Sequence, residues 1–190
     1  MSSAERALET ATRARTRRAI LDAAVTVLSQ DPTASLGDIA AAAGVGRTTL
    51  HRYFPERSAL QHDLGSDALE RIDDAAERAH LARGTAPEAL GRLCQELFEL
   101  GDLLMLIFSD PQFTQSAAWT ECTASDRAII ELVENGHRDG TVDPELPPEW
   151  VQNLLWSLLY SAWQQASTEH VTKHQALSLC LRTLRKSIAA

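Results

Sequence analysis

The chain has 190 residues, of which 44% are hydrophobic, and carries a formal net charge of −8. This length suits one large domain or two small ones, and the hydrophobic content supports a buried core and excludes global disorder. The apolar runs are too short to span a bilayer, and the N-terminus lacks the apolar stretch of a signal peptide, so we expect a cytoplasmic protein with no membrane partner.

The charge is distributed unevenly along the chain. Residues 1–60 carry eight arginines against six acidic residues, whereas residues 61–190 carry ten basic residues against 20 acidic ones. The acidic residues 61–190, which we call the body, repel DNA, and only an arginine-rich segment is suited to approach it. The N-terminal third is therefore the candidate for nucleic-acid binding.

Helix-forming residues dominate throughout, and the alternating β-branched or aromatic runs that are typical of strands are absent. After a flexible arm over residues 1–10, an apolar stripe predicts a helix from about Ala11 to Leu28. Asp31-Pro32 ends this helix, and Ser35 is placed to cap the next one.

The third helix of the chain is part of the Ser35–Leu60 segment described below. Six further helices are predicted after it, each from a cap or a proline at its start. They begin at Pro55, at the capping box Thr85–Glu88, at Asp110-Pro111, at Ser125-Asp126, at Glu149 and at the Thr172–Gln175 cap. The helix from Pro55 is expected to end near Arg83, the next near Phe108, and the one from Glu149 near Ser167. The fold class is therefore all-α, with about nine helices.

The segment from Ser35 to Leu60 has the pattern of a helix-turn-helix. Ala40 is small enough for two helices to cross, Gly44 permits the tight turn, and Leu50 packs the second helix inward. At the N-terminal end of the second helix, three side chains are expected to contact base edges: Arg47, Thr48 and Thr49. Contacts to backbone phosphates are expected from His51, Arg52, Tyr53 and Arg57.

An arginine cluster precedes this segment, at Arg13, Arg15, Arg17 and Arg18. It is either a solvated helix start or an arm that contacts DNA. Basic charge at the start of a helix opposes the helix dipole, so its placement favours the DNA contact, with Arg17 as the candidate.

Residues 13–60 resemble the DNA-binding domain of the tetracycline-repressor (TetR) family of bacterial regulators. The family pattern runs roughly I-A-x-x-A-G-V-S-x-G-T-L-Y-x-[HY]-F-x-x-K-x-x-L. The chain matches it at Ile39, Ala40, Ala43, Gly44, Val45, Thr49, Leu50, Tyr53, Phe54 and Leu60. It departs from the pattern at Gly46, Thr48, His51 and Arg57, where the family has Ser, Gly, Tyr and Lys.

The resemblance implies a one-component transcriptional regulator, a repressor rather than an activator. A homodimer would bind a pseudo-palindromic double-stranded DNA operator and leave it when a small-molecule effector binds. The implied domains are an arm over 1–10, a helix-turn-helix domain over 11–55, and an effector-binding and dimerisation domain over 56–190.

Large apolar side chains in the C-terminal helices are the candidates for an effector pocket. They are Met105, Phe108, Phe113, Trp119, Trp156, Tyr160 and Trp163. The alternative is that they are ordinary core residues. Because few basic residues lie nearby in the sequence, the effector is expected to be apolar or cationic.

The last two helices carry more apolar surface than a single bundle needs, which favours a four-helix dimer interface. Its candidate residues are Leu154, Leu158, Ala162, Leu177, Leu181 and Leu184. The alternative is that these side chains only fill the core of one chain.

The sequence indicates no catalytic residues, metal ligands or cofactor. Gly44 to Thr49 superficially matches a phosphate-binding loop but lacks its lysine and preceding strand. Cys94, Cys122 and Cys180 are expected to be reduced and mostly buried, and His170 and His174 to be surface residues. The remaining alternatives are a ligand-carrier or protein-interaction module that has lost DNA binding and, with least support, an all-helical enzyme.

Overall fold

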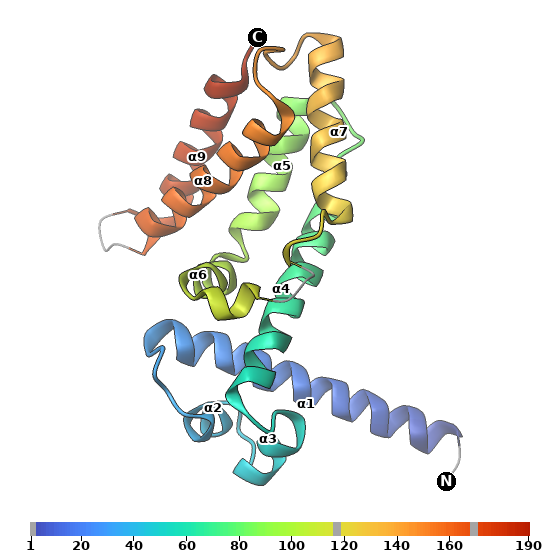
Figure 1. The fold of residues 1–190 in the computed structure, drawn as a ribbon, viewed down its shortest axis with the longest axis vertical. Helices are drawn as coiled ribbons and strands as arrows, with labels where there is room; N and C mark the ends of the chain where they lie inside the picture. Colours follow the sequence, from blue (N-terminus) through green and yellow to red (C-terminus); the bar gives the residue numbers. More distant parts are fainter. Residues whose placement is uncertain (1–2, 116–118, 168–170) are drawn as a thin grey trace. The chain divides into compact units, whose positions relative to one another are not determined.

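The computed structural model describes residues 3–115, 119–167 and 171–190, with side chains from residue 10 onward. In these ranges the chain forms nine α-helices and a 3-10 helix, with no strand, which confirms the all-α class (Figure 1). The elements are α1 (Ser3–Gln30), α2 (Leu36–Ala42), α3 (Arg47–Tyr53), α4 (Arg57–Arg78), α5 (Ala86–Phe98), α6 (Gly101–Ser109), η1 (Pro111–Thr114), α7 (Ala124–Asp139), α8 (Pro148–Ala166) and α9 (Lys173–Ile188). None of the helices in the described part of the chain has the length and apolar character needed to cross a membrane.

The chain divides into two compact units. The first contains residues up to Asp67 and the segment 102–116, and the second contains residues 68–101 and 117–190. The first half of α4 belongs to the first unit because it packs on α1. Leu60 and Leu64 are fully buried there, and two arginines of α1 form ion pairs with carboxylates of α4. The compact boundary therefore falls inside α4, whereas the sequence suggests a boundary after residue 55.

Helix α1 begins at Ser3, whereas the sequence predicts a flexible arm over residues 1–10. Alanine, glutamate, arginine and leucine are all strong helix formers, so the backbone can stay helical where no apolar face needs burial. The apolar stripe used for the prediction lies only in the second half of α1. There Ile20, Leu21 and Leu28 are buried in the core of the first unit.

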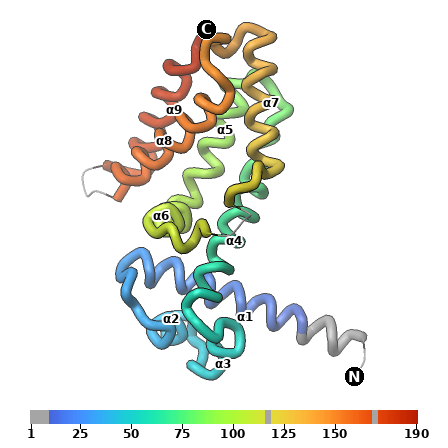
Figure 2. The backbone as a smooth tube through the Cα atoms, viewed as in Figure 1, coloured from blue at the N-terminus to red at the C-terminus, as the bar shows by residue number. Residues whose placement is uncertain are grey.

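In the second unit, α8 and α9 lie side by side along their length (Figure 2). The helix predicted over residues 85–108 is interrupted before Gly101, and α5 and α6 are separate. A Cβ atom at Gly101 would lie only 2.6 Å from Cδ1 of Trp163. The Trp163 indole is buried and donates a hydrogen bond of 3.1 Å to the carbonyl of Phe98 near the end of α5. The break thus accommodates a tryptophan that is distant in sequence.

Two other helix starts differ from the prediction. Asp110 caps only the short 3-10 helix η1 rather than an α-helix. The helix expected from Ser125-Asp126 begins earlier, because Thr123 is its N-cap and Asp126 completes a capping box. The capping boxes predicted at Thr85 and Thr172 are both present.

The turn between α4 and α5 is held by one arginine from α5. The guanidinium of Arg92 donates hydrogen bonds to the carbonyls of Ala79, His80 and Arg83, at distances of 2.8, 3.0 and 2.5 Å. Carbonyls at the end of a helix have no partner within it, so a cation at this position satisfies them.

The cysteines are free thiols. Cys94 and Cys180 are buried with their sulfur atoms 3.3 Å apart, whereas Cys122 is exposed. The hydrogen bond to Cys180 and burial both raise the pKa of Cys94, so this thiol stays protonated. The expectation of mostly buried thiols is confirmed for this pair and is wrong for Cys122.

The capping box at the start of α5 makes stability depend on pH. Glu88 accepts a 3.0 Å hydrogen bond from the backbone N–H of Thr85 and a second one from the Thr85 side chain. Both bonds favour the charged carboxylate, so they lower the pKa of Glu88 below its ordinary value of 4.5. A lowered pKa in the folded state adds stability above the ordinary value, and this stability is lost as the pH falls through the folded pKa.

We therefore expect Glu88→Gln to melt at a lower temperature than the wild type near neutral pH and at the same temperature once Glu88 is protonated. Circular dichroism melts from about pH 3 to about pH 7 measure this difference. Glu70→Gln, at an exposed position in α4, is the matched control. A melting difference that stays constant over this pH range would contradict the assignment.

Candidate DNA-binding surface and ligand groove

Helices α2 and α3 are joined by a tight turn at Gly44, which has a φ of 66°. The N–H groups of Gly44 and Val45 donate to the carbonyls of Ala41 and Ala40 at 3.1 and 2.9 Å. This pair of bonds is the glycine-dependent helix end known as a Schellman motif. Gly46 then caps α3 without a side-chain bond, so the segment is a turn between helices and not a phosphate-binding loop.

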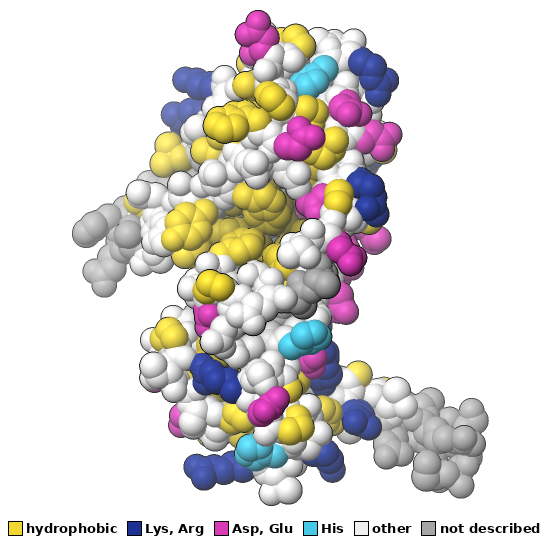
Figure 3. Space-filling view, viewed as in Figure 1, with side chains coloured by type: hydrophobic (Ala, Val, Ile, Leu, Met, Phe, Trp, Pro, Cys, Tyr) yellow, Lys and Arg dark blue, Asp and Glu magenta, His cyan; other side chains and the backbone are white. Residues whose placement is uncertain are grey.

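The predicted base-reading residues lie at the start of α3. Arg47 and Thr48 are exposed, and Thr49 is half-buried, while Leu50 is fully buried beneath them. Dark-blue and cyan basic side chains lie at the end of the first unit that carries α2 and α3 (Figure 3). The arrangement leaves one polar face of α3 free to contact DNA.

Arg47 folds back over the start of α2. A Cβ atom at Gly37 would lie 3.2 Å from Nε of Arg47, so glycine leaves space for this side chain. The hydrogen bonds from Ser35, and the smaller effect of the nearby Arg47 charge, lower the pKa of Asp38. The guanidinium therefore lies close to the capping box of α2.

The predicted phosphate contacts fall into two groups. His51, Arg52 and Tyr53 lie at the C-terminal end of α3, where His51 and Arg52 are exposed and Tyr53 is half-buried. Nδ1 of His51 lies 3.3 Å from the carbonyl of Pro55. The guanidinium of Arg57 instead donates to the carbonyls of Ala34 and Pro32, at 2.6 and 2.5 Å.

Arg17 is also bound within the chain. Its guanidinium donates to Oδ2 of Asp63 at 2.8 Å, and Arg18 pairs with Asp67 at 2.6 Å, where the carboxylate side chain is only 1% exposed. These bonds fasten α1 to α4. The structure thus does not place Arg17 or Arg57 with the free polar face of α3, and sequence reasoning had no signal for their carboxylate and carbonyl partners.

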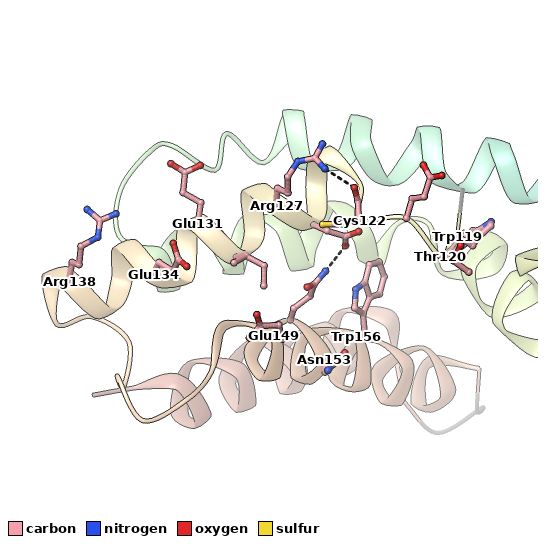
Figure 4. A pocket seen from close by; sticks show the side chains of 14 residues that line it. Trp119, Thr120, Cys122, Arg127, Glu131, Glu134, Arg138, Glu149, Asn153 and Trp156 are labelled. Atoms are coloured by element: carbon pink, nitrogen blue, oxygen red, sulfur yellow. Dashed lines mark hydrogen bonds between the residues drawn. The ribbon is translucent and has the colours of Figure 1, made fainter. Parts of the chain in front are cut away.

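A groove of about 910 Å³ runs between α7 and α8 in the second unit (Figure 4). Its lining includes the predicted residues Trp119 and Trp156. Five carboxylates line it, those of Glu121, Asp126, Glu131, Glu134 and Glu149, against the two cations of Arg127 and Arg138. The groove therefore carries a negative charge beside two large aromatic rings.

The groove residues are held by one hydrogen bond between α8 and α7 and by another within the α7 side. Nε2 of Gln152 on α8 donates to Oδ1 of Asp126 on α7, and Nη1 of Arg127 donates to the carbonyl of Cys122 at 2.7 Å. Trp156 rises from α8, while Glu134 and Glu149 come from opposite walls (Figure 4). These carboxylates were not predicted from the sequence, because large apolar residues are the usual indication of a ligand pocket. Asp126, Glu131 and Glu134 are all on α7, and their common helix was the one signal for these three.

The other predicted pocket residues do not join this groove. Met105, Phe108 and Phe113 belong to the first compact unit. Tyr160 is exposed on α8, where its hydroxyl accepts a bond from Gln164, and Trp163 is a buried core residue.

The predicted dimer residues differ in exposure. Ala162 and Leu184 are buried within the chain itself, so they have no surface to offer a partner. Leu154, Leu158, Leu177 and Leu181 are half-buried. Three large side chains of α8 and α9 are exposed, namely Trp150, Tyr160 and Leu179.

Metal-binding chemistry finds no support in the described residues, which hold no cluster of three or more suitable side chains. His174 is exposed at the start of α9, as expected, and His170 lies outside the described residues.

Residues 13–64 are called the head below. Both the head and the whole chain match known proteins. Residues 20–64 match the family described as bacterial regulatory proteins, tetR family. The HTH-type transcriptional repressor LfrR of Mycolicibacterium smegmatis is 38% identical over 184 residues, which cover 95% of this chain and 94% of LfrR. The chain belongs to the TetR family.

Solved structures of TetR-family regulators agree with this assignment. LfrR from Mycobacterium smegmatis in complex with proflavine is 34% identical, with a TM-score of 0.75 over 93% of this chain and 98% of that one. A TetR-family regulator from Rhodococcus sp., at 16% identity, shares the fold with a TM-score of 0.72 over 93% of this chain and 100% of that one. The chain is thus a TetR-like DNA-binding transcriptional regulator, which favours this function over a carrier or interaction module.

The hydrogen bonds from Arg57 to two backbone carbonyls predict that this side chain stabilises the folded head. We expect Arg57→Ala to destabilise the protein by about 1–2 kcal/mol, because two carbonyls lose charged donors. Arg52→Ala, which removes an exposed guanidinium, should leave stability nearly unchanged. Urea denaturation of both variants makes the comparison, and equal stabilities would show that the Arg57 bonds contribute nothing.

Proposed function

We propose that the chain is a cytoplasmic, homodimeric repressor that binds a pseudo-palindromic operator and leaves it when a cationic aromatic effector binds. The negatively charged groove with its two tryptophans is the observation that carries the effector class. The exposed face of α3 supports the operator contact.

On the DNA side, α3 would enter the major groove with its N-terminal end against the bases. Arg47 would pair with guanine, and the methyl groups of Thr48 and Thr49 would contact thymine. His51, Arg52 and Tyr53 would bind backbone phosphates. Arg47 would first move away from its position over Gly37. Two heads of a dimer would occupy half-sites about 34–36 Å apart.

On the effector side, the groove offers what a flat cation requires. A Trp156 ring binds a cation through its face or stacks on an aromatic plane, and surrounding carboxylates compensate the positive charge. Proflavine, which is bound in the LfrR complex, is a planar aromatic cation. It is therefore the first probe for this chain.

The dimer would form through α8 and α9. Trp150 is 59% exposed and Leu179 is 50% exposed, so apolar surface remains uncovered on this helix pair. Leu154 and Leu158 on α8 would add to the contact, while Leu181 packs beside Gly91 of α5. Exposed apolar patches mark interaction sites, and a second copy of the chain would cover this one.

The operator prediction is tested with DNA from either side of the protein's own coding region. We expect saturable binding by fluorescence anisotropy to one fragment with two half-sites, and much weaker binding when one half-site is scrambled. Arg47→Ala should lose most of the preference for this fragment, because a bidentate contact to guanine carries about 1–3 kcal/mol of discrimination. Sequence-independent binding by the wild type would refute the operator proposal.

The effector prediction is tested on the protein without DNA. We expect calorimetry to detect proflavine binding, and the double variant Glu134→Gln/Glu149→Gln to bind it about tenfold more weakly, because two compensating charges are lost. Glu145→Gln, at an exposed loop position outside the groove, is the matched control.

Release from DNA is then compared between the wild type and the double variant at one proflavine concentration. Because any direct effect of the dye on DNA is the same in both samples, only a difference between them reports the groove. Equal proflavine affinity in all three proteins would place the effector elsewhere.

A further inference from the structure

Two arginines from different helices converge on the ring of Tyr53 in α3. The guanidinium carbon of Arg52 lies 5.7 Å from the ring centre, and that of Arg13 in α1 lies 5.8 Å from it. Both arginines are exposed, and Tyr53 is half-buried. One aromatic ring thus holds two positive charges at the surface of the first unit.

The charges at Arg13 and Arg52 have no carboxylate partner among the residues that the structure describes. Other arginines of α1 differ in this respect, since Arg17 pairs with Asp63 and Arg18 with Asp67. A ring face attracts a cation but does not neutralise its charge. Two like charges held near one ring therefore favour an anion between or beside them.

The three side chains together match the chemistry of a phosphate. A guanidinium presents its N–H donors as a planar fork that fits phosphate oxygens, and a phenol hydroxyl adds one more donor. The site lies at the C-terminal end of the helix whose other end is placed against the bases. An anion bound there while α3 occupies the major groove is a phosphate of the DNA backbone.

We propose that Arg13 completes, with Arg52 and Tyr53, a binding site for one backbone phosphate of the bound DNA. The inference rests on the proposed function, in which α3 enters the major groove. It extends that function because Arg13 precedes the family match at residues 20–64. Helix α1 thereby contributes directly to the DNA-binding surface.

The sequence treats the arginines of α1 as one cluster, and the structure separates them by their partners. Arg17 and Arg18 hold α4, Arg15 bonds to Thr12 within α1, and only Arg13 reaches the ring on α3. Neighbouring positions on a helix point in different directions, so the arginines of this one cluster lie on different faces of α1.

The test compares Arg13→Ala with Arg15→Ala, a matched removal of one exposed arginine from the same helix. Binding to the operator and to an unrelated duplex is measured by anisotropy over about 50–200 mM salt. We expect Arg13→Ala to make the slope of log K against log salt shallower by about 0.9 on both duplexes, and to weaken binding about fivefold. Arg15→Ala should change neither quantity. Equal behaviour of the two variants would overturn the proposal.

A second measurement asks whether Arg13 acts at the same site as Tyr53. Arg13→Ala should cost less affinity in a Tyr53→Phe background than in the wild type, because the shared phosphate is already held less well. Equal cost in both backgrounds would overturn the shared site. A wild type that binds the two duplexes equally would refute the operator proposal alone, since a phosphate contact is still measured on either duplex.

Discussion

An all-helical protein must find partners for the backbone groups at the ends of its helices, and this chain does so with side chains at several of these ends. Ser35 and Asp38 satisfy the start of α2, and the same reciprocal arrangement begins α5, α7 and α9. At two places the carbonyls are bound by an arginine. Arg57 serves the carbonyls before α2, and Arg92 serves those after α4. Helix α3 is too short to be stable alone, so it depends on its contacts within the first unit, of which the buried Leu50 is one.

The need to pair polar and charged groups inside the molecule also decides how the positive charge of the head is used. Arg57, Arg17 and Arg18 are bound to carbonyls or carboxylates of the first unit and hold its helices together. Arg13 and Arg52 are exposed and available for the proposed phosphate contact, and Arg47 is exposed and available for a base. A head with few free cations, in a chain of net charge −8, has weak general attraction for DNA. Its binding must then depend on the placement of individual contacts rather than on total charge.

The acidic body is suited to a different ligand chemistry from that of the head. Magenta acidic side chains are spread over the α7 side of the second unit (Figure 3). Five carboxylates line the groove with Trp119 and Trp156, and a bound cation would relieve their mutual repulsion. Under the proposed function, repulsion of DNA by the body and attraction of a cationic effector come from the same negative charge.

Local sequence signals were sufficient for features that a few neighbouring residues control. The turn at Gly44, the caps at Ser35, Thr85 and Thr172, and the inward position of Leu50 follow from backbone freedom, short-range hydrogen bonds and helical spacing. The start of α1 was not predictable from apolar spacing, because helix propensity alone extends it to Ser3.

The sequence by itself determined the all-α class, the helix-turn-helix and the polar face of α3, since these depend on residues within one or two helical turns of each other. Only the tertiary structure decided which arginines form ion pairs within the chain, why the helix ends before Gly101, and where the carboxylates lie in the groove beside Trp156. Each of these outcomes joins residues far apart in sequence. Their contacts depend on how helices pack, and helical periodicity specifies a face but not the residue that will lie against it.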